Sequence, residues 1–366
     1  MEKVAQKLEK GNYLFCPIDL HDRMMLVGFA VDKGEPRYRQ LDTREESGER
    51  KLREVLRGWQ EANLGGVIWV AYEASGSGFG LADRLGEAGF RVKVLAPSHL
   101  PSSAKSRSEK TDRKDCLRIL EVLRGHVLAG NQLHAVWIPG LQLRDDRELV
   151  RRRLRMGEEI TRVKNQIQGL LKRNGQRRPE GMKTAWGLGF RAWLKRLMVE
   201  LSGGAGATLA SHLRELEFYE AEKLGLERGL RELARQPRYQ AQVERMMGLK
   251  GVGLLTAMVF ATEMGELSRF GNRKSVGCYL GLTPRRFQSG EETDHSGHIS
   301  RLGPARVRKV LNQAAWAVVR YELAWGEWFA ERIAGQGPAV KKIMITAVMR
   351  RLGIWLWHQG MSAVAA

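Results

Sequence analysis

Three features that mark particular classes of protein are scarce in this sequence: cysteine, long hydrophobic runs and acidic residues. The three cysteines, Cys16, Cys116 and Cys278, are far apart and odd in number. This pattern fits neither a disulfide framework nor a Cys-x-x-Cys zinc site. We therefore expect all three to be buried small hydrophobic residues.

No stretch approaches the roughly 18 uninterrupted apolar residues of a membrane-spanning helix. The most apolar C-terminal run, residues 343–357, is interrupted by Arg350 and Arg351. Residues 1–12 are rich in Lys and Glu and contain no apolar core of a secretory signal. These absences predict a cytoplasmic protein without a membrane segment, and for a nucleic-acid-binding protein this means one associated with the bacterial nucleoid.

Acidic residues are outnumbered, with 41 Asp and Glu against 61 Lys and Arg, a net charge of +20 and a pI near 10.2. Such an excess attracts polyanions whatever the fold. Nucleic acid is the leading partner, and an anionic membrane surface is the alternative. The length of 366 residues and a hydrophobic content of 43% indicate two or three folded domains.

The first third of the chain alternates strand-like and helix-like patterns. Apolar runs predict strands, and apolar residues at helical spacing predict the helices between them. The predicted order is strands at 13–19, 24–31 and 38–41, a helix at 44–62, a strand at 65–72, a helix at 79–88, a strand at 91–96 and a helix opened by Thr111. This order favours a mixed α/β sheet covered by helices.

Four acids stand at positions where such a fold can bring them together. Asp19 and Glu73 end two strands, and Asp112 and Asp115 lie three apart in the last helix, a spacing that puts both on one face. The same helix carries an apolar stripe and a ring of cations: Leu117, Ile119, Leu120 and Leu123; Arg107, Lys110, Arg113 and Lys114. Four clustered carboxylates need a compensating cation, so the pattern predicts a Mg²⁺ or Mn²⁺ site of the ribonuclease-H-like kind. Alternatively, Asp19 caps a turn, Glu73 begins a loop, and the helix only exposes a mixed-charge face to solvent.

The middle of the chain is predicted to be helical and basic. Residues 144–178 contain 12 Lys or Arg against 5 Asp or Glu, and residues 209–233 repeat leucine at helical spacing, including Leu224. The two helices could pair as an antiparallel hairpin or with another protomer. Between them, aromatic and basic residues alternate over 183–201, which suits either stacking on unpaired bases or a packed helix tip with a cationic face. Residues 202–207, Ser-Gly-Gly-Ala-Gly-Ala, predict a flexible loop.

The last third carries two motifs of possible chemistry. Residues 249–253, Leu-Lys-Gly-Val-Gly, are similar to a helix-hairpin-helix turn whose backbone N–H groups approach a phosphate. Residues 283–303 form a polar stretch that predicts an exposed loop, followed by a helix after Pro304 with Arg306, Arg308 and Lys309 near its start. Ser289 in that loop is a candidate nucleophile if a base, an arginine or a metal activates it, but Ser-Gly is also an ordinary turn, and Ser296 and Ser300 share the loop.

Taken together, the motifs resemble the DEDD transposases of bacterial insertion sequences, of the insertion-sequence 110 type. The resemblance extends nearly end to end and rests on Ile18-Asp19; Tyr72-Glu73-Ala74 with Gly76; Lys110-Thr111-Asp112-Arg113-Lys114-Asp115 after Pro97 and Pro101; Leu249-Lys250-Gly251-Val252-Gly253; Tyr279-Leu280-Gly281-Leu282-Thr283-Pro284; Gln288-Ser289-Gly290; and Ile299-Ser300-Arg301-Leu302-Gly303. The departures are Lys250, Cys116 and Pro304, where the family usually has proline, alanine and asparagine.

The resemblance implies an RNA-guided DNA recombinase with a RuvC-like domain at 1–140, a helical coiled-coil region at 141–240 and a mainly helical transposase domain at 241–366. By position, Asp19, Glu73, Asp112 and Asp115 match the metal-binding tetrad, and Ser289 matches the serine that forms a phosphoserine with DNA. The implied partners are a guide (bridge) RNA, donor and target double-stranded DNA, and further copies of the chain in a dimer or tetramer. We expect nucleic-acid contacts from Lys110, Arg113, Lys250, Gly251, Gly253, Arg285, Arg286, Arg301 and Arg306.

Two other functions fit the same residues. A metal-dependent nuclease or junction resolvase would use water in place of Ser289, and would tolerate its loss. A structural RNA- or DNA-binding protein would tolerate the loss of Asp115.

Overall fold

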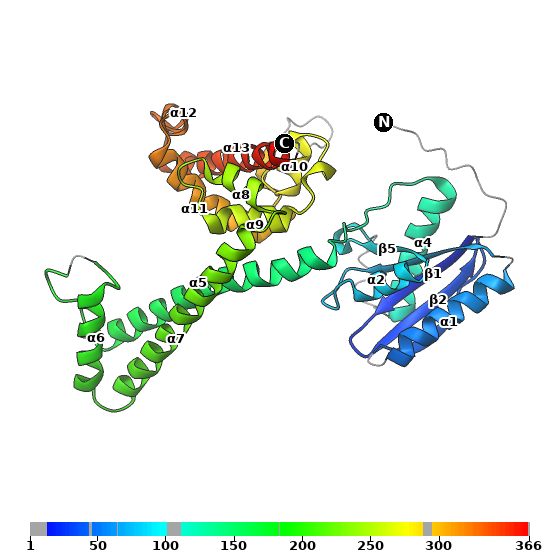
Figure 1. Ribbon diagram of the computed structural model, residues 1–366, viewed down its shortest axis with the longest axis horizontal. Coiled ribbons are helices and arrows are strands. Elements are labelled where there is room, and N and C mark those ends of the chain that lie inside the picture. Colours follow the sequence, from blue (N-terminus) through cyan, green and yellow to red (C-terminus); the bar gives the residue numbers. More distant parts are fainter. Residues whose placement is uncertain are drawn as a thin grey trace. The chain divides into compact units, whose positions relative to one another are not determined.

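The computed structural model describes residues 13–43, 46–63, 65–100, 111–182, 184–287 and 295–364. Its contacts divide the chain into two compact units, residues 1–138 and 139–366 (Figure 1). The first is a mixed α/β unit and the second is mainly helical, as expected. The separation of the second unit at residue 240 stays a prediction.

A five-stranded mixed sheet forms the centre of the first unit, with strands in the order β3-β2-β1-β4-β5. The strands are β1 (Tyr13–Leu20), β2 (Met24–Val31), β3 (Arg37–Asp42), β4 (Val67–Glu73) and β5 (Arg91–Leu95). The first three pair antiparallel, whereas β4 runs parallel to both β1 and β5. All five lie within two residues of the predicted positions, because each is an apolar run bounded by polar residues.

Helices cover both faces of this sheet. α1 (Glu46–Ala62) and α2 (Gly80–Glu87) pack on one face, and α4 (Asp112–Ala129) packs on the other. A short 3₁₀ turn, η1 (Pro97–His99), follows β5. Along β1, Ile18 packs against α1 and α2 on one face, and Phe15 packs against α4 on the other, as the alternation of side chains along a strand requires.

α4 begins where the sequence predicts. The Thr111 hydroxyl caps it by accepting the Lys114 backbone N–H at 3.4 Å, and Gly130 ends it in the left-handed region with φ of 72°. The predicted apolar stripe is wrong at Leu117, which is 38% exposed. The face turned to the sheet instead carries Cys116, one position earlier, with the remaining members of the stripe, Ile119, Leu120 and Leu123.

Two long helices, α5 (Leu141–Arg173) and α7 (Gly203–Ala234), lie side by side in the second unit, and α6 (Leu188–Glu200) packs against α7 (Figure 1). This confirms the predicted hairpin. The predicted loop at 202–207 is wrong, because α7 already begins at Gly203. A Cβ on Gly206 would lie 2.1 Å from the Leu201 carbonyl oxygen, so a glycine-rich sequence here permits close packing rather than flexibility. Leu224 is 62% exposed and lies outside the packed seam.

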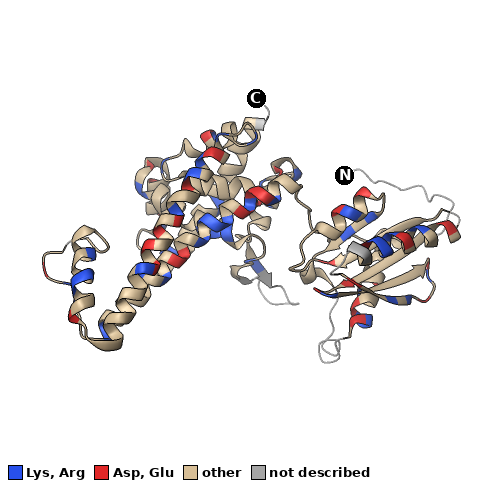
Figure 2. Cartoon of the chain, turned by 60° about the horizontal axis from the view of Figure 1, so that its bottom comes forward, with Lys and Arg blue, Asp and Glu red and all other residues tan. Residues whose placement is uncertain are grey.

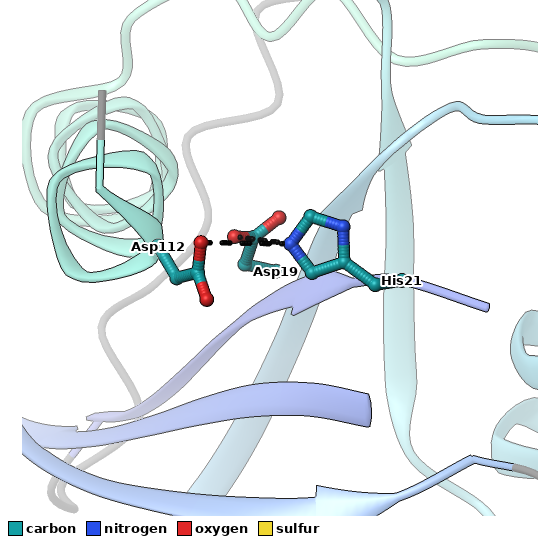
Figure 3. A group of neighbouring side chains, drawn as sticks. All are labelled: Asp19, His21 and Asp112. Carbon is teal, nitrogen blue, oxygen red and sulfur yellow. Dashed lines mark hydrogen bonds and ion pairs between the residues drawn. The ribbon is translucent and has the colours of Figure 1, made fainter. Parts of the chain in front are cut away.

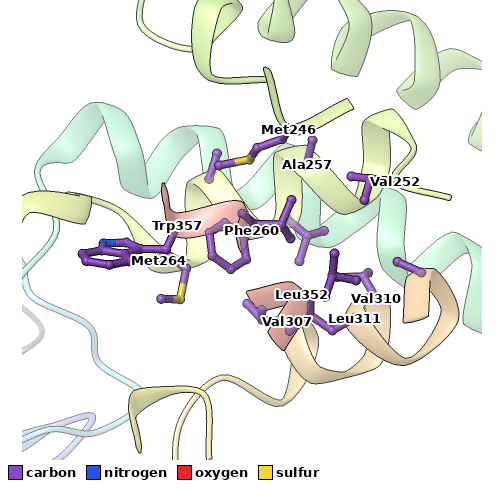
Figure 4. Close-up of a cluster of buried hydrophobic side chains, with 14 of the residues drawn as sticks. Met246, Val252, Ala257, Phe260, Met264, Val307, Val310, Leu311, Leu352 and Trp357 are labelled. Atoms are coloured by element: carbon purple, nitrogen blue, oxygen red, sulfur yellow. The ribbon is translucent and has the colours of Figure 1, made fainter. Parts of the chain in front are cut away.

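The remaining helices surround one hydrophobic core (Figure 4). They are α8 (Gln240–Met247), α9 (Leu254–Met264), η2 (Leu267–Arg269), α10 (Arg273–Tyr279), α11 (Ala305–Tyr321), α12 (Leu323–Ile333) and α13 (Pro338–Val364). Phe260 at the centre is fully buried, and the Trp357 indole N–H donates to the Leu267 carbonyl at 3.0 Å. Cys278 is exposed, which contradicts the expectation that all three cysteines are buried. Only two of the seven residues of α10, Val276 and Gly277, turn inward.

The predicted loop at 283–303 is also wrong in part. Strands β6 (Pro284–Phe287) and β7 (His295–Ile299) pair antiparallel there and form a two-stranded hairpin. Ser289 lies outside the described residues. Among the described residues, no helix is both long enough and apolar enough to cross a bilayer.

Candidate functional site

Asp19, His21 and Asp112 form a compact group of possible metal ligands in the first unit (Figure 3). One ligand atom from each lies within 4.8 Å of the others. His21 Nε2 is 3.1 Å from Asp19 Oδ2 and 3.7 Å from Asp112 Oδ1. Two carboxylates therefore converge on one imidazole at an accessible site.

The fold explains why these residues meet. Asp19 is the second-last residue of β1, and the strand period places it on the face that α4 covers. Asp112 is the first residue of α4, where the positive end of the helix dipole favours a carboxylate. The sequence prediction missed His21. Its signal was the spacing of two from Asp19, which returns a side chain to the same side of an extended chain.

The other two predicted acids, Glu73 and Asp115, lie outside this group. Glu73 is the last residue of β4. Ile18 of β1 pairs with Tyr72 of the parallel strand β4, so the next residues of the two strands, Asp19 and Glu73, lie at the same edge of the sheet. Asp115 is buried, 6% exposed, and forms an ion pair with Arg118 one turn further along α4. The structure thus brings Asp19 and Asp112 together, whereas Asp115 has a cationic partner of its own.

A buried thiol lies beneath the two aspartates. Cys116 Sγ donates to the Leu26 carbonyl at 3.3 Å. Burial raises the pKa of Cys116 to about 12, and the nearby carboxylates of Asp19 and Asp112 act in the same direction, against a hydrogen bond with the Asp19 backbone. The thiol is therefore neutral at physiological pH and is a poor metal ligand, since the thiolate is the binding form. Oxygen atoms and one imidazole are the available donors.

This donor set fits a divalent cation. Mg²⁺ takes carboxylate oxygens together with retained water, and Mn²⁺ also accepts imidazole. Asp112, with 60% of its side chain exposed, leaves the site open to water and to a substrate. The site can hold a cation without closing its coordination shell.

The hairpin that carries Ser289 is held at its base by close backbone packing. A Cβ on Gly281 would lie 2.0 Å from the Leu302 carbonyl oxygen, and one on Gly303 would lie 1.9 Å from the Tyr279 carbonyl oxygen. Both glycines have positive φ, 66° and 91°. The Arg308 guanidinium donates to the carbonyls of Leu280, Leu302 and Gly303. Two glycines and an arginine therefore hold together the segments that precede β6 and follow β7.

The predicted phosphate-binding turn is confirmed as a turn between α8 and α9. Gly251 has φ of 103°, and a Cβ there would lie 2.7 Å from the Val318 backbone nitrogen. The Lys250 backbone N–H donates to Glu322 Oε1 at 2.8 Å, so a carboxylate of the same chain already takes this donor. Gly253 is the N-cap of α9. This turn is tightly packed on α11, and its lysine side chain remains exposed.

Four of the other predicted nucleic-acid contacts are exposed cations. Arg113 lies 5.6 Å above the Tyr38 ring, and Arg285 donates to the Ser300 carbonyl at 3.2 Å. Arg301 has a positive φ of 56°, and Arg306 is the second residue of α11. Lys110 and the side chain of Arg286 lie outside the described residues.

The aromatic residues around α6 pack against one another, which supports a packed helix tip over a surface that stacks on unpaired bases. Phe190 is 5% exposed, and Trp186 and Trp193 pack half-buried against the same core. Trp186 and Phe190 meet edge to face with centroids 5.2 Å apart. They form a packed helix tip rather than a surface for stacking bases.

Comparison with known proteins relates both units to transposases. Residues 18–174 match the DEDD family model of insertion-sequence 110 (IS110) type, described as "Transposase", and residues 243–331 match the model described as "Transposase IS116/IS110/IS902 family". Two relatives from Sinorhizobium fredii are named as transposases y4qE and y4rJ. They are 28% and 29% identical, over 77% and 79% of this chain and 66% and 76% of their own lengths. The transposase for insertion sequence element IS1111A of Coxiella burnetii is 25% identical, over 64% of this chain and 61% of its own length.

Proposed function

Because the chain carries both the DEDD domain and the transposase domain of IS110-type insertion sequences, we propose that it is an RNA-guided DNA recombinase that joins donor and target DNA by serine attack. The single observation that carries the proposal is the convergence of Asp19 and Asp112 at an open site within the segment that matches the DEDD model. The guide RNA, the two duplexes and an assembly of two or four copies belong to this proposal.

The acidic site would hold the divalent cation through Asp19 and Asp112, with Glu73 and Asp115 as the remaining members of the tetrad. His21 contacts both converging carboxylates and serves as a further ligand or as the group that orients them. A bound Mg²⁺ or Mn²⁺ would neutralise charge on the phosphoryl oxygens during strand transfer. The cation would also remove the repulsion between the two carboxylates.

Ser289 is the proposed nucleophile. Its hydroxyl oxygen forms a bond to a DNA phosphorus, and the bond from that phosphorus to the deoxyribose oxygen breaks. The proton leaves with the released DNA hydroxyl, so the phosphodiester energy is kept in the phosphoserine and no ATP is needed. The close backbone packing at Gly281 and Gly303 and the hydrogen bonds of Arg308 support this role, because a nucleophile must be held in position.

The test is a covalent-adduct assay. Protein, flanking RNA and labelled donor and target DNA are incubated with Mg²⁺ and resolved on a denaturing gel. We expect a protein–DNA adduct that is lost in Ser289→Ala and retained in Ser296→Ala, the matched control from the same hairpin. Cleavage with free ends, no adduct and no effect of Ser289→Ala would replace the recombinase with a hydrolytic nuclease.

The metal proposal has its own test. We expect Asp112→Asn to abolish the adduct and to weaken Mn²⁺ binding measured by electron paramagnetic resonance, while Asp83→Asn, an acid of α2 in the same unit, leaves both unchanged. Unaltered Mn²⁺ binding in Asp112→Asn would show that the cation lies elsewhere. Active mixtures of an Asp112→Asn protein with a Ser289→Ala protein would indicate that two copies share one active site.

A further inference from the structure

The C-terminal helices carry exposed aromatic rings covered by cations, a combination that the proposed chemistry does not use. Lys341 Nζ lies 5.9 Å from the Trp316 ring centroid, and Arg320 lies 5.5 Å above Tyr321. Trp316 and Tyr321 are 40% and 59% exposed. We name this the α11–α13 surface, made up of Trp316, Arg320, Tyr321, Trp328, Lys341 and Arg351.

The most organised part of the surface is centred on Arg351. Its guanidinium carbon is 4.7 Å from the ring centroid of Trp325 and 5.2 Å from that of Trp328. Arg332 approaches the same Trp328 ring at 4.2 Å. A guanidinium in contact with two indole faces is stabilised without using its N–H groups as hydrogen-bond donors, so these remain available to an anion.

The cations of this surface are free to meet an external anion. Among the described residues, its three cations, Arg320, Lys341 and Arg351, have no carboxylate partner, whereas the neighbouring Arg332, which is not part of the surface, pairs with Glu331 at 3.6 Å. Residues 305–364 contain nine Lys or Arg against three Glu. Charge complementarity therefore points to a polyanion.

The groove of about 1040 Å³ along α5 offers a useful contrast. It also contains cations, but acids of the same chain neutralise most of them. Arg162 pairs with Glu159 and Glu215, and Lys309 pairs with Glu158. A polyanion entering that groove would have to break existing ion pairs, whereas the α11–α13 surface requires no such exchange.

We propose that the α11–α13 surface binds a single-stranded segment of nucleic acid, with its exposed rings stacking on unpaired bases and its unpaired cations contacting phosphates. The unpaired cations indicate a polyanion, and the exposed rings indicate that its bases are unpaired. In a duplex the base faces are already stacked on one another, so exposed rings gain nothing from it. Guide RNA and displaced DNA strands share the chemistry of unpaired bases on a phosphate backbone.

Binding is tested by fluorescence anisotropy with labelled oligothymidine, oligouridine and a DNA duplex, without divalent cations so that no cleavage occurs. We expect single strands to bind more tightly than the duplex. Trp316→Ala should weaken single-strand binding by about 5- to 150-fold, the usual effect of losing one stacked base, and Trp316→Phe should retain most of it. The larger loss, with DNA or with RNA, identifies which strand the surface receives.

The charge contribution is tested separately with two exposed cations of the surface. Lys341→Gln with Arg351→Gln should reduce the slope of log affinity against log salt by about 1.4, or about 0.7 for each phosphate that is no longer neutralised. Arg196→Gln, an exposed cation of α6 without a ring contact among the described residues, is the matched control and should change the slope by less.

Two results would overturn the inference. Equal affinities for duplex and single strand, with no effect of Trp316→Ala, would show that the exposed rings do not stack on bases. If Trp316→Ala changed the mass of the protein in analytical ultracentrifugation but not its affinity for single strands, the surface would instead be a contact between protein chains. Because no step of strand transfer is measured, either result leaves the adduct test of the proposed recombinase unaffected.

Discussion

Replacing Gly281 by alanine should destabilise the second unit far more than the same replacement at Gly335. Both glycines lie in this unit with nearly the same backbone angle, φ of 66° and 69°. An alanine at either position adopts the left-handed region, which costs about 1 kcal/mol relative to glycine. The two substitutions therefore share their conformational penalty.

The difference lies in the space around the added methyl group. A Cβ at Gly281 would lie 2.0 Å from the Leu302 carbonyl oxygen and 2.9 Å from the Leu302 nitrogen, whereas nothing lies within 4 Å at Gly335. Backbone atoms cannot rotate away as a side chain can, so the base of the Ser289 hairpin must shift. Such overpacking adds about 1–3 kcal/mol. We expect a total of about 2–4 kcal/mol for Gly281→Ala and about 1 kcal/mol for Gly335→Ala.

Differential scanning calorimetry measures the contrast directly. For a unit of this size, each kcal/mol lowers the Tm by about 2–4 °C. Gly335→Ala should shift the transition of the second unit by only that amount, and Gly281→Ala by about two to four times as much. Equal shifts would refute the argument that close backbone approach, and not the dihedral angle alone, requires glycine at 281.

Two further predictions concern titratable groups. Burial acts to raise the pKa of Glu263, but hydrogen bonds from Arg151 at 2.7 and 2.9 Å lower it overall, so the pair stabilises the fold above the ordinary carboxyl pKa of 4.5 and loses that contribution as pH falls through the lowered value. Glu263→Gln should therefore lower the free energy of unfolding by roughly 2 kcal/mol at neutral pH. When that free energy is measured by urea unfolding at a series of pH values, the variant should lose less stability than the wild type as the pH falls, and an equal loss would contradict this. Burial raises the pKa of both Cys16 and Cys116, whereas Cys278 is exposed, so iodoacetamide on the native protein near pH 8 should add a single adduct by mass spectrometry, and two or three adducts would contradict the fold.

The sheet unit was predictable because its signals are local. Apolar runs fix the strands, and Thr111 marks the start of α4 by a side-chain cap that the residue type and its position already indicate. The alternation of buried faces then places Asp19 and Asp112 on one side of the sheet. His21 was missed because its spacing of two from Asp19 is a weak signal on its own, and only the start of the opposite helix, with Asp112, shows that the site includes it.

Two of the failures, the loops predicted at 202–207 and 283–303, share one physical cause, which is close approach between backbone segments at glycines. Gly206 permits the start of α7 to pack on the Leu201 carbonyl, and Gly281 and Gly303 permit the backbone before β6 to approach the backbone after β7 closely. From sequence alone, a glycine-rich segment predicts a flexible loop, although glycine also occurs where two backbones pack closely. Only the neighbouring backbone distinguishes the two uses.

The distribution of charge shows why composition alone could not locate a nucleic-acid surface. α5 carries ten Lys or Arg against five acids and was predicted to be the basic helix, but its partner α7 supplies six acids against four bases, and red and blue segments alternate along both helices in Figure 2. Arg153 pairs with Glu227 across this hairpin, and Arg162 pairs with Glu215. Ion pairs of this kind reduce the charge available to an external ligand, because a phosphate must compete with a carboxylate already in contact. The net charge of +20 therefore acts mainly where cations lack such partners, and among the described residues Arg320, Lys341 and Arg351 of the α11–α13 surface meet that condition.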